Sequence, residues 1–380
     1  MNKLRVGVVG LGHRGRAIFT LASKFDCVIP AAACDILPRN WYEKQWLSEA
    51  PLAELLPETK FYEDYDRMLA EADLDVVIVE TGADIHASFC AKALARDIHV
   101  LSDIPVVANL REAKELWEAA AGSKAIISVG ANPNEQKFTV LLNEYFKSGK
   151  LGKPYCMEAE YIHWSMPTAT EHVHLNENGD WRKLLNPIRY CTHSLGPLLT
   201  VLDEELRYVS CFGTGQHGND YPPGTSPTKD DMACAQFRTD SGAVVRLQRN
   251  GRCRANIGHH NYRVFGTEGY MERIDRQGKP VIRYNSTMEQ YPAALLEVSG
   301  EFMPPAYADN PAATGHGGMD YAMLDHFFTA LLTGGEAPIS LRAGLAMTLP
   351  GIYAEESARR GGQVLRMTYP WEPDFSVDIP

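Results

Sequence analysis

The sequence predicts an α/β domain built on a doubly wound parallel sheet, followed by an α+β domain with a mostly antiparallel open sheet. Over roughly the first 125 residues, short and continuously apolar strands alternate with amphipathic helices. From about residue 130, partial period-2 alternation and a β-rich composition take over. A chain of 380 residues is also too long for one ordinary domain. We expect the domains at residues 1–127 and 128–380.

Continuous apolar strands belong to parallel sheets that helices cover on both faces, and right-handed crossovers then wind the fold in both directions. The ligand site of such a fold lies at the carboxyl ends of the strands. The expected strands of the first domain are Arg5–Val9, Val28–Cys34, Val76–Val79, His99–Ser102 and Ile126–Val129. Its expected helices are Arg14–Lys24, Trp41–Ala50, Tyr65–Ala72, Ile85–Ala95 and Leu110–Ala121.

The second domain is expected to combine an open sheet with three helices, and Tyr369–Pro380 reads as an irregular tail. The predicted helices are Phe138–Ser148, Tyr190–Leu202 and Tyr321–Leu332. The predicted strands are Tyr155–Ile162, Tyr208–Gly213, Ala233–Arg238, Ala243–Arg249, Tyr262–Phe265 and Val281–Tyr284. Because an open sheet would leave a large apolar face to be covered, we expect a homodimer or homotetramer.

A glycine-rich turn, GLGHRG, follows the first strand and opens the first helix. Gly10 permits the tight turn, Gly12 lets the backbone approach a pyrophosphate, and Gly15 lets the helix pack on the strand. Asp35 ends the second strand, where a carboxylate accepts hydrogen bonds from the adenosine ribose. The pattern predicts a Rossmann domain that binds NAD rather than NADP, although Arg39 lies close enough in sequence to complicate that choice.

The segments ETGADIH (80–86) and DIP (103–105) end two further strands and should converge on the same sheet edge. His86 could either contact the cofactor or only cap its helix. Together with the glycine turn and Asp35, the expected cofactor contacts are His13, Arg14, Ile36, Thr81, His86, Asp103, Pro105 and Asn132.

Composition narrows the possible partners. The formal charge of -11 argues against nucleic acid and anionic membrane, and no apolar run approaches the ~20 residues of a membrane span. The chain enters a strand by about Leu4, which leaves no room for a secretory signal. The eight cysteines occur singly, without a CxxC pair, which favours reduced thiols and a cytoplasmic protein. His172 and His174 could chelate a metal, but no supporting ligand stands nearby, so we expect none.

Proton-transfer chemistry is expected in the second domain, because Ile104 at the third strand end cannot carry a proton. Tyr190 and His193 are three residues apart, so they share one face of a predicted helix. A phenol beside an imidazole can act as a proton-transfer pair. Alternatively, Tyr190 is a half-buried aromatic residue and His193 a hydrogen-bonded core histidine.

The segments VGVVGLGHRG, ACD, TGADIH and FGTEG (265–269) resemble, over nearly the whole chain, the glucose-fructose oxidoreductase, inositol dehydrogenase and MocA (Gfo/Idh/MocA) family. Typical dehydrogenases of that family have EKP, with a catalytic lysine, where this chain has Asp103-Ile104-Pro105. The D-x-G-x-H motif of that family is also changed, since Arg189 replaces the aspartate and His193 keeps the histidine place.

Three further motifs are similar to one branch of that family, the NAD-dependent glycoside hydrolases known as α-N-acetylgalactosaminidases. They are Trp181-Arg182, the run Tyr190-x-Thr192-His193-x-Leu195-Gly196-Pro197, and GHGGMD (315–320). Tyr161-x-His163 also resembles a Y-x-H segment of that branch. Trp164 and Trp181 would suit stacking on a pyranose ring. The expected substrate contacts are Tyr161, His163, Trp164, Trp181, Arg182, Arg189 and His316.

The resemblance implies a glycosidase that oxidises a sugar hydroxyl at carbon 3, eliminates the aglycone, adds water and reduces the ketone again. Tyr190 and His193 would share the proton work, in roles that the sequence leaves open. One alternative is a sugar or polyol dehydrogenase with His193 as base, and another is a non-catalytic NAD-binding protein. The sugar itself stays open, and Arg189, Arg252 and Arg254 keep an acidic or sulfonated one among the possibilities.

Overall fold

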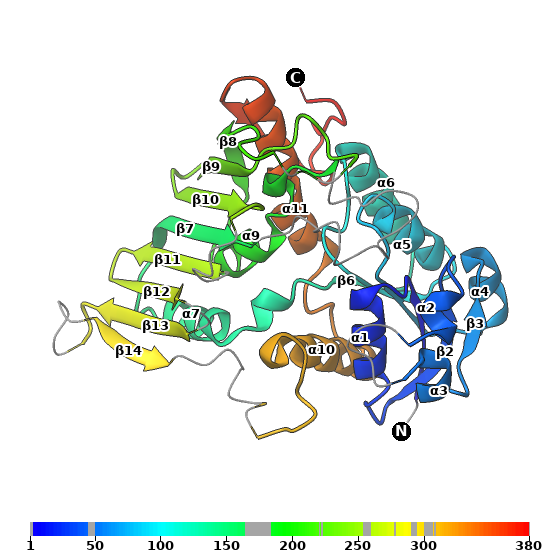
Figure 1. Cartoon of the computed structure of the whole chain (residues 1–380). Coiled ribbons are helices and arrows are strands. Elements are labelled where there is room, and N and C mark those ends of the chain that lie inside the picture. The colour runs from blue at the N-terminus through cyan, green and yellow to red at the C-terminus, as the bar shows by residue number, and fades with distance from the viewer. Residues whose placement is uncertain are drawn as a thin grey trace. The chain divides into compact units, whose positions relative to one another are not determined.

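The computed structural model describes residues 3–44, 50–163, 184–219, 221, 223–253, 260–276, 279–289, 295–299, 307 and 309–379. By packing, the chain divides into two units, and Figure 1 shows the elements of each. The first unit contains residues 1–131 and 306–344, and the second contains residues 132–305 and 345–380. The domain boundary expected between residues 127 and 128 stays a prediction, and the packing adds a late segment, residues 306–344, to the first unit.

The first unit is built on a parallel sheet of six strands in the order β3-β2-β1-β4-β5-β6, which confirms the predicted doubly wound fold. The order reverses between β1 and β4, and ligands of such sheets bind in the crevice at this reversal. The strands are β1 (Leu4–Val9), β2 (Val28–Cys34), β3 (Lys60–Tyr62), β4 (Val76–Val79), β5 (His99–Ser102) and β6 (Ile127–Val129). Strand β3, which is three residues long, was not predicted.

Helices cover this sheet largely where the apolar periodicity predicted them. They are α1 (His13–Ala22), α4 (Tyr65–Glu71), α5 (His86–Leu94), α6 (Leu110–Ala121) and α10 (Met319–Thr333). Side-chain capping fixes two of these starts: Asp64 accepts a hydrogen bond from the Arg67 amide, and Asn109 accepts one from the Glu112 amide. Helix α10 packs against α1 and buries Phe327 and Phe328 in the core beneath the sheet. This packing is the reason that residues 306–344 belong to the first unit.

The single helix expected over Trp41–Ala50 is wrong. A short helix α2 (Arg39–Tyr42) follows Pro38, and another, α3 (Leu52–Leu55), follows Pro51. Proline favours a helix start, so each short helix begins after one, and α2 ends before Glu43, whose backbone is extended. Residues 45–49 lie outside the described part of the chain.

The second unit contains a sheet of nine strands in the order β14-β13-β12-β11-β7-β10-β9-β8-β15. Among the strand pairs that the structure describes, β7 and β10 are parallel and the others antiparallel, so the mostly antiparallel open sheet is confirmed. The first strands are β7 (Pro154–Ile162), β8 (Leu206–Gly213), β9 (Met232–Thr239) and β10 (Val244–Asn250). The others are β11 (His260–Gly266), β12 (Gly269–Arg276), β13 (Lys279–Ser286), β14 (Leu296–Ser299) and β15 (Leu365–Arg366).

Helix α9 (Thr192–Leu199) packs on β7 and β11 and is shorter than the predicted Tyr190–Leu202. A 3₁₀ turn, η2 (Pro187–Arg189), precedes it, and Tyr190 has non-helical dihedral angles. Helix α7 (Lys137–Lys147) was predicted. Helix α11 (Leu341–Arg359) was not, because Pro350 and Gly351 in its middle are typical of a break.

The face of this sheet opposite the buried one is not uniformly apolar, which corrects the premise of the expected large apolar face. Alternate residues of neighbouring strands form a ladder of ion pairs across it. Glu158 on β7 lies 3.1 Å from Arg246 on β10 and 2.9 Å from Arg263 on β11. Glu272 on β12 lies 4.0 Å from Arg263. A homodimer or homotetramer stays a prediction.

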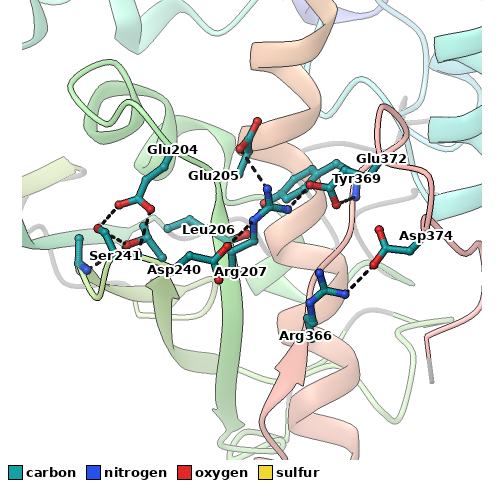
Figure 2. Close-up of polar contacts among 12 residues, drawn as sticks. Glu204, Glu205, Leu206, Arg207, Asp240, Ser241, Arg366, Tyr369, Glu372 and Asp374 are labelled. Atoms are coloured by element: carbon teal, nitrogen blue, oxygen red, sulfur yellow. Dashed lines mark hydrogen bonds and ion pairs between the residues drawn. The ribbon is translucent and has the colours of Figure 1, made fainter.

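The carboxyl-terminal tail is irregular in its backbone, but side chains anchor it to β8, the strand next to the edge strand β15 (Figure 2). Arg207 on β8 pairs with Glu372 of the tail and lies over the Tyr369 ring at 5.5 Å. The buried Tyr369 hydroxyl donates to the Leu206 carbonyl at 2.8 Å. Arg366 on β15 pairs with Asp374 at 2.7 Å. Because the edge strand β15 pairs with only two residues of β8, the tail adds contacts to β8 beyond those two residues.

Candidate functional site

The glycine turn after β1 has the geometry that a bound dinucleotide requires. Gly10 has φ +89°, and a Cβ there would lie 2.6 Å from the Glu80 carbonyl oxygen. A Cβ on Gly15 would lie 1.8 Å from the Gly10 carbonyl oxygen. At Gly12, by contrast, a Cβ would meet no atom within 4 Å. The turn is therefore closed on its sheet side and open at Gly12, where a pyrophosphate approaches the backbone.

Asp35 lies at the end of β2 and is held by the backbone on either side of it. Its two carboxylate oxygens accept hydrogen bonds from the Leu11 amide at 2.7 Å and the Leu37 amide at 2.8 Å. These bonds fix the acid beside the glycine turn, as ribose recognition requires. The neighbouring Ile36 and His13 are exposed.

Arg14 in the turn is the centre of a charged cluster in the first unit. Its guanidinium lies 2.7 Å from Asp320 at the start of α10, and 3.9 Å from both Glu80 and Asp103 at strand ends. His316 lies 2.8 Å from the same Asp320 carboxylate and 3.3 Å from Arg14. The sequence motifs GLGHRG, ETGADIH, DIP and GHGGMD thus meet at one place within this unit.

The charges of this cluster shift one another's pKa values. Burial opposes the charge of Arg14, but the carboxylates of Asp320, Asp103 and Glu80 outweigh it and raise the pKa of Arg14. Burial would raise the pKa of Asp320, yet the hydrogen bond from His316 and the charge of Arg14 lower it. Glu80 is different, because burial and then the Asp103 charge raise the pKa of Glu80 well above its usual value. Burial and the neighbouring Asp103 charge thus disfavour the ionised form of Glu80 relative to an exposed glutamate.

His86, at the start of α5, connects two of the strand-end segments. It is buried, and its ring nitrogens lie 2.9 Å from the carbonyl oxygens of Pro105 and Thr81. Asn132, another expected cofactor contact, is buried in the 3₁₀ turn η1 (Asn132–Glu135) of the second unit. All of the expected cofactor contacts stay predictions.

In the second unit, the structure brings Tyr190 and His193 together. The Tyr190 hydroxyl lies 3.5 Å from His193 Nε2, and the two rings meet edge to face with centroids 5.2 Å apart. The His193 carbonyl accepts a hydrogen bond from the Tyr262 hydroxyl at 2.7 Å, which ties α9 to β11. A phenol–imidazole contact of this kind can transfer a proton.

Register places three side chains in a row beside this pair. Tyr161 on β7 is directly opposite Arg249 on β10 and His260 on β11. The Arg249 guanidinium lies 4.1 Å from the centroid of the Tyr161 ring. The His260 ring stacks on the same Tyr161 ring, with 4.1 Å between the ring centroids. His163 stacks on Tyr161 at 5.4 Å. The predicted substrate residues Tyr161 and His163 therefore lie in one cluster with Tyr190 and His193.

Sequence reasoning missed the place of Arg249 and His260 in this cluster. Strand alternation puts Val245, Leu247 and Arg249 on one buried face of β10, which was a usable signal. Tyr161 meets both residues because of the register between strands that are far apart in sequence. Alternation within one strand does not predict that register.

The remaining expected substrate contacts fall elsewhere. Arg189 pairs with Glu355 at 3.1 Å, and His316 belongs to the charged cluster of the first unit. Arg252, one of the arginines that kept an acidic sugar among the possible substrates, lies over the Tyr221 ring at 4.4 Å. Trp164, Trp181 and Arg182, together with Arg254, His172 and His174, lie outside the described residues.

The described residues contain no group of three or more histidine, cysteine, aspartate or glutamate side chains that could hold a metal ion. None of the helices described is both long and apolar enough to cross a membrane.

The fold and the glycine turn define an NAD-dependent enzyme with a Rossmann unit and a second, open-sheet unit. Comparison with family models agrees: an oxidoreductase-family model for an NAD-binding Rossmann fold matches residues 4–131. A second model, the GFO/IDH/MocA carboxyl-terminal domain, matches residues 140–272. The chain belongs to the Gfo/Idh/MocA family, and the predicted NAD cofactor is confirmed.

Relatives with curated names include a glycosyl hydrolase family 109 protein of Shewanella woodyi, which is 22% identical over 99% of this chain and 85% of its own length. An alpha-N-acetylgalactosaminidase of Shewanella oneidensis is 21% identical over 99% of this chain and 86% of its own length. Among solved structures, a levoglucosan dehydrogenase in complex with NADH and L-sorbose has a TM-score of 0.79 and 17% identity. It covers 97% of this chain and 100% of its own.

Proposed function

We propose that this protein is a glycoside hydrolase that uses bound NAD to oxidise a sugar hydroxyl transiently, with carbon 3 as the position oxidised. The observation that carries the proposal is the 3.5 Å contact between the Tyr190 hydroxyl and His193 Nε2. The strand end Asp103-Ile104-Pro105 offers no lysine for this work, and Ile104 is buried. The similarity to family 109 hydrolases over nearly the whole chain supports the same proposal.

Bound NAD would supply the oxidation of the sugar hydroxyl and the later reduction of the ketone. The glycine turn and Asp35 would hold it. Between these two events, the ketone acidifies the hydrogen on carbon 2, and a base among Tyr190 and His193 removes it. The aglycone then leaves from carbon 1, water adds, and the net reaction is hydrolysis. Such a reaction needs no pair of carboxylates flanking the glycosidic bond.

The test is to incubate the purified protein with aryl glycosides without added cofactor, while aglycone release and absorbance at 340 nm are recorded. We expect aglycone release with no net NADH, and deuterium at carbon 2 of the product when the reaction runs in D₂O. The Tyr190→Phe and His193→Ala variants should lose most turnover and keep NAD binding. His217→Ala, which changes an exposed histidine of the same unit, is the matched control.

A sugar or polyol dehydrogenase is the second candidate, with His193 as base. The structural likeness to levoglucosan dehydrogenase, at a TM-score of 0.79, favours it. A free sugar that yields stoichiometric NADH with this protein would establish the dehydrogenase and exclude the hydrolase.

A further inference from the structure

Two acidic side chains, those of Glu80 and Asp103, meet at the carboxyl ends of β4 and β5 in the first unit. The Glu80 side chain is 2% exposed and that of Asp103 is 20% exposed. The two side chains are close enough to share a hydrogen bond. A carboxylate only accepts hydrogen bonds, so a bond between two carboxyl groups requires a proton on one of them. Without that proton, two buried negative charges would repel each other at close range.

The charges around this pair do not favour two ionised carboxyl groups. Arg14, at the start of α1, lies 3.9 Å from each of them, but it lies closer, at 2.7 Å, to a third carboxylate, that of Asp320. The same Asp320 carboxylate lies 2.8 Å from His316 Nδ1. One guanidinium thus faces three carboxyl groups, and Glu80 is the most buried of the three. Burial and the Asp103 charge raise the pKa of Glu80, which makes this pair the place where a proton is held most readily.

The pair lies beside the glycine turn, in the half of the sheet where the nicotinamide is expected. A Cβ on Gly15 would lie 3.0 Å from the Glu80 Cβ, so this acid packs directly against the turn. Asp35, which would bind the adenosine ribose, ends β2 in the half formed by β3, β2 and β1. Since a dinucleotide binds across both halves, its nicotinamide belongs over the ends of β4, β5 and β6.

The nicotinamide ring changes its charge when it is reduced. In NAD⁺ the ring is a cation, which favours ionised carboxylates in its neighbourhood. In NADH the ring is neutral, so nearby carboxyl groups lose this support and bind a proton more readily. A group that holds its proton with different strength in two complexes makes the ratio of the two affinities depend on pH.

We propose that Glu80 and Asp103 share one proton that is bound more tightly beside NADH than beside NAD⁺, so that the enzyme favours the reduced cofactor increasingly as pH falls. The proton comes from solvent, and no electron passes to either residue. This inference goes beyond the proposed function, because a hydrolase and a dehydrogenase would both bind these two forms of the cofactor. In the hydrolase, the shared proton would help to retain NADH between oxidation of the sugar and reduction of the ketone.

The experiment is calorimetric titration of the nucleotide-free protein with NAD⁺ and with NADH, between about pH 6 and about pH 9. We expect the Kd of NAD⁺ divided by the Kd of NADH to rise about tenfold toward the acid end, as the loss of one charge near a partly buried pair would cause. In the range where this ratio changes, titrations in two buffers of different ionisation enthalpy should show that NADH binding takes up more protons than NAD⁺ binding.

Variants separate the pair from the other groups of the cluster. Glu80→Gln cannot titrate, so its Kd ratio should not change with pH. Asp103→Asn removes the neighbouring negative charge, so the change in ratio should move toward acid. Asp84→Asn alters an exposed acid of the same strand-end segment and is the matched control, with the native pH dependence. His316→Gln removes the imidazole of the cluster, which is the other group that could respond near neutral pH.

A native Kd ratio that does not vary with pH overturns the proposal, and so does a native pH dependence in Glu80→Gln. A dependence that persists in Glu80→Gln and disappears in His316→Gln would assign the proton to His316 instead. If Glu80→Gln does not fold by circular dichroism, Asp103→Asn takes its place, and an unmoved pH dependence there overturns the proposal. The titrations need no sugar, so they can support the shared proton even if the protein releases no aglycone and the proposed hydrolase fails.

Discussion

The glycines in the turn after β1 have different roles, because Gly15 is packed tightly against backbone atoms and Gly12 is open. A Cβ at position 15 would lie 1.8 Å from the Gly10 carbonyl oxygen, whereas position 12 is open. We expect Gly15→Ala to lower the thermal midpoint and abolish NAD binding, because backbone atoms must move. Gly12→Ala should keep the midpoint and weaken NAD binding, because its methyl group blocks only the ligand. Calorimetric titration with NAD and thermal unfolding of both variants distinguish the two effects, and equal melting of both would contradict this assignment.

Glu80 predicts a particular pH dependence of stability. Burial and the Asp103 charge raise the pKa of Glu80 in the folded protein, so ionisation costs more folded than unfolded. The loss of folding stability that ionised Glu80 causes is absent below the pKa of glutamate in the unfolded chain, about 4.3, and it grows as pH rises above that value. We expect Glu80→Gln to lose less stability than the native protein between about pH 4 and neutral pH. Urea unfolding at several pH values measures the unfolding free energy of the two proteins. If this free energy changes with pH in the same way in both, Glu80 is not the cause of the pH dependence.

Asp320 predicts the opposite dependence. Although burial opposes it, the bonds from His316 and Arg14 lower the pKa of Asp320, so its contribution is present above the unfolded pKa of about 3.9 and is lost as pH falls below that value. Asp320→Asn should cost about 3 kcal/mol of unfolding free energy at neutral pH, because Arg14 keeps a buried charge without this partner. The difference from the native protein should shrink in acid. A constant difference across the pH range would contradict the assignment.

Elements at the edges of the second sheet depend on contacts that are distant in sequence, and the anchored tail is the clearest case (Figure 2). The Tyr369 ring is fully buried and its hydroxyl donates to Leu206. We expect Tyr369→Phe to cost about 1 kcal/mol for the hydrogen bond, and Tyr369→Ala about 3–5 kcal/mol for the lost packing. Urea unfolding measures both, with Tyr155→Phe on an exposed tyrosine as control. A tail that contributes nothing would give three equal midpoints.

The elements that could be predicted are those whose signal is local. Continuous apolar runs gave the strands Val28–Cys34 and Val76–Val79 with the bounds that the structure has. Strand β12 was missed because mixed charges obscure its alternation, and β14 because it is only four residues long. Helix α11 was missed because Pro350 and Gly351 in its middle are typical of a break. Tyr190 and His193 were paired from helical spacing, and they do meet, although Tyr190 precedes α9 and is not helical. Arg249 could not be placed from local spacing, because strand register places it beside Tyr161.

At the scale of the whole molecule, the first unit is discontinuous in sequence. Its core joins Ile18 and Phe19 of α1 to Leu324, Phe327 and Phe328 of α10, all at most 1% exposed. The nascent chain can therefore complete this core only after most of the second unit has been made. Removal of α10 would leave the apolar face of α1 uncovered, and each large buried side chain contributes about 1.5–3 kcal/mol of burial free energy.

A fragment of residues 1–131 should for this reason fail to unfold cooperatively and should bind NAD weakly or not at all, although it contains the glycine turn and Asp35. Joining residues 306–344 to that fragment through a long Gly/Ser linker should restore both properties, because linker length costs little closure entropy. Phe327→Ala with Phe328→Ala in the joined fragment should abolish the rescue. Circular dichroism melting and calorimetric titration with NAD measure these outcomes. If residues 1–131 alone melt cooperatively and bind NAD as tightly as the full chain, α10 is an accessory to the cofactor-binding unit rather than part of its core.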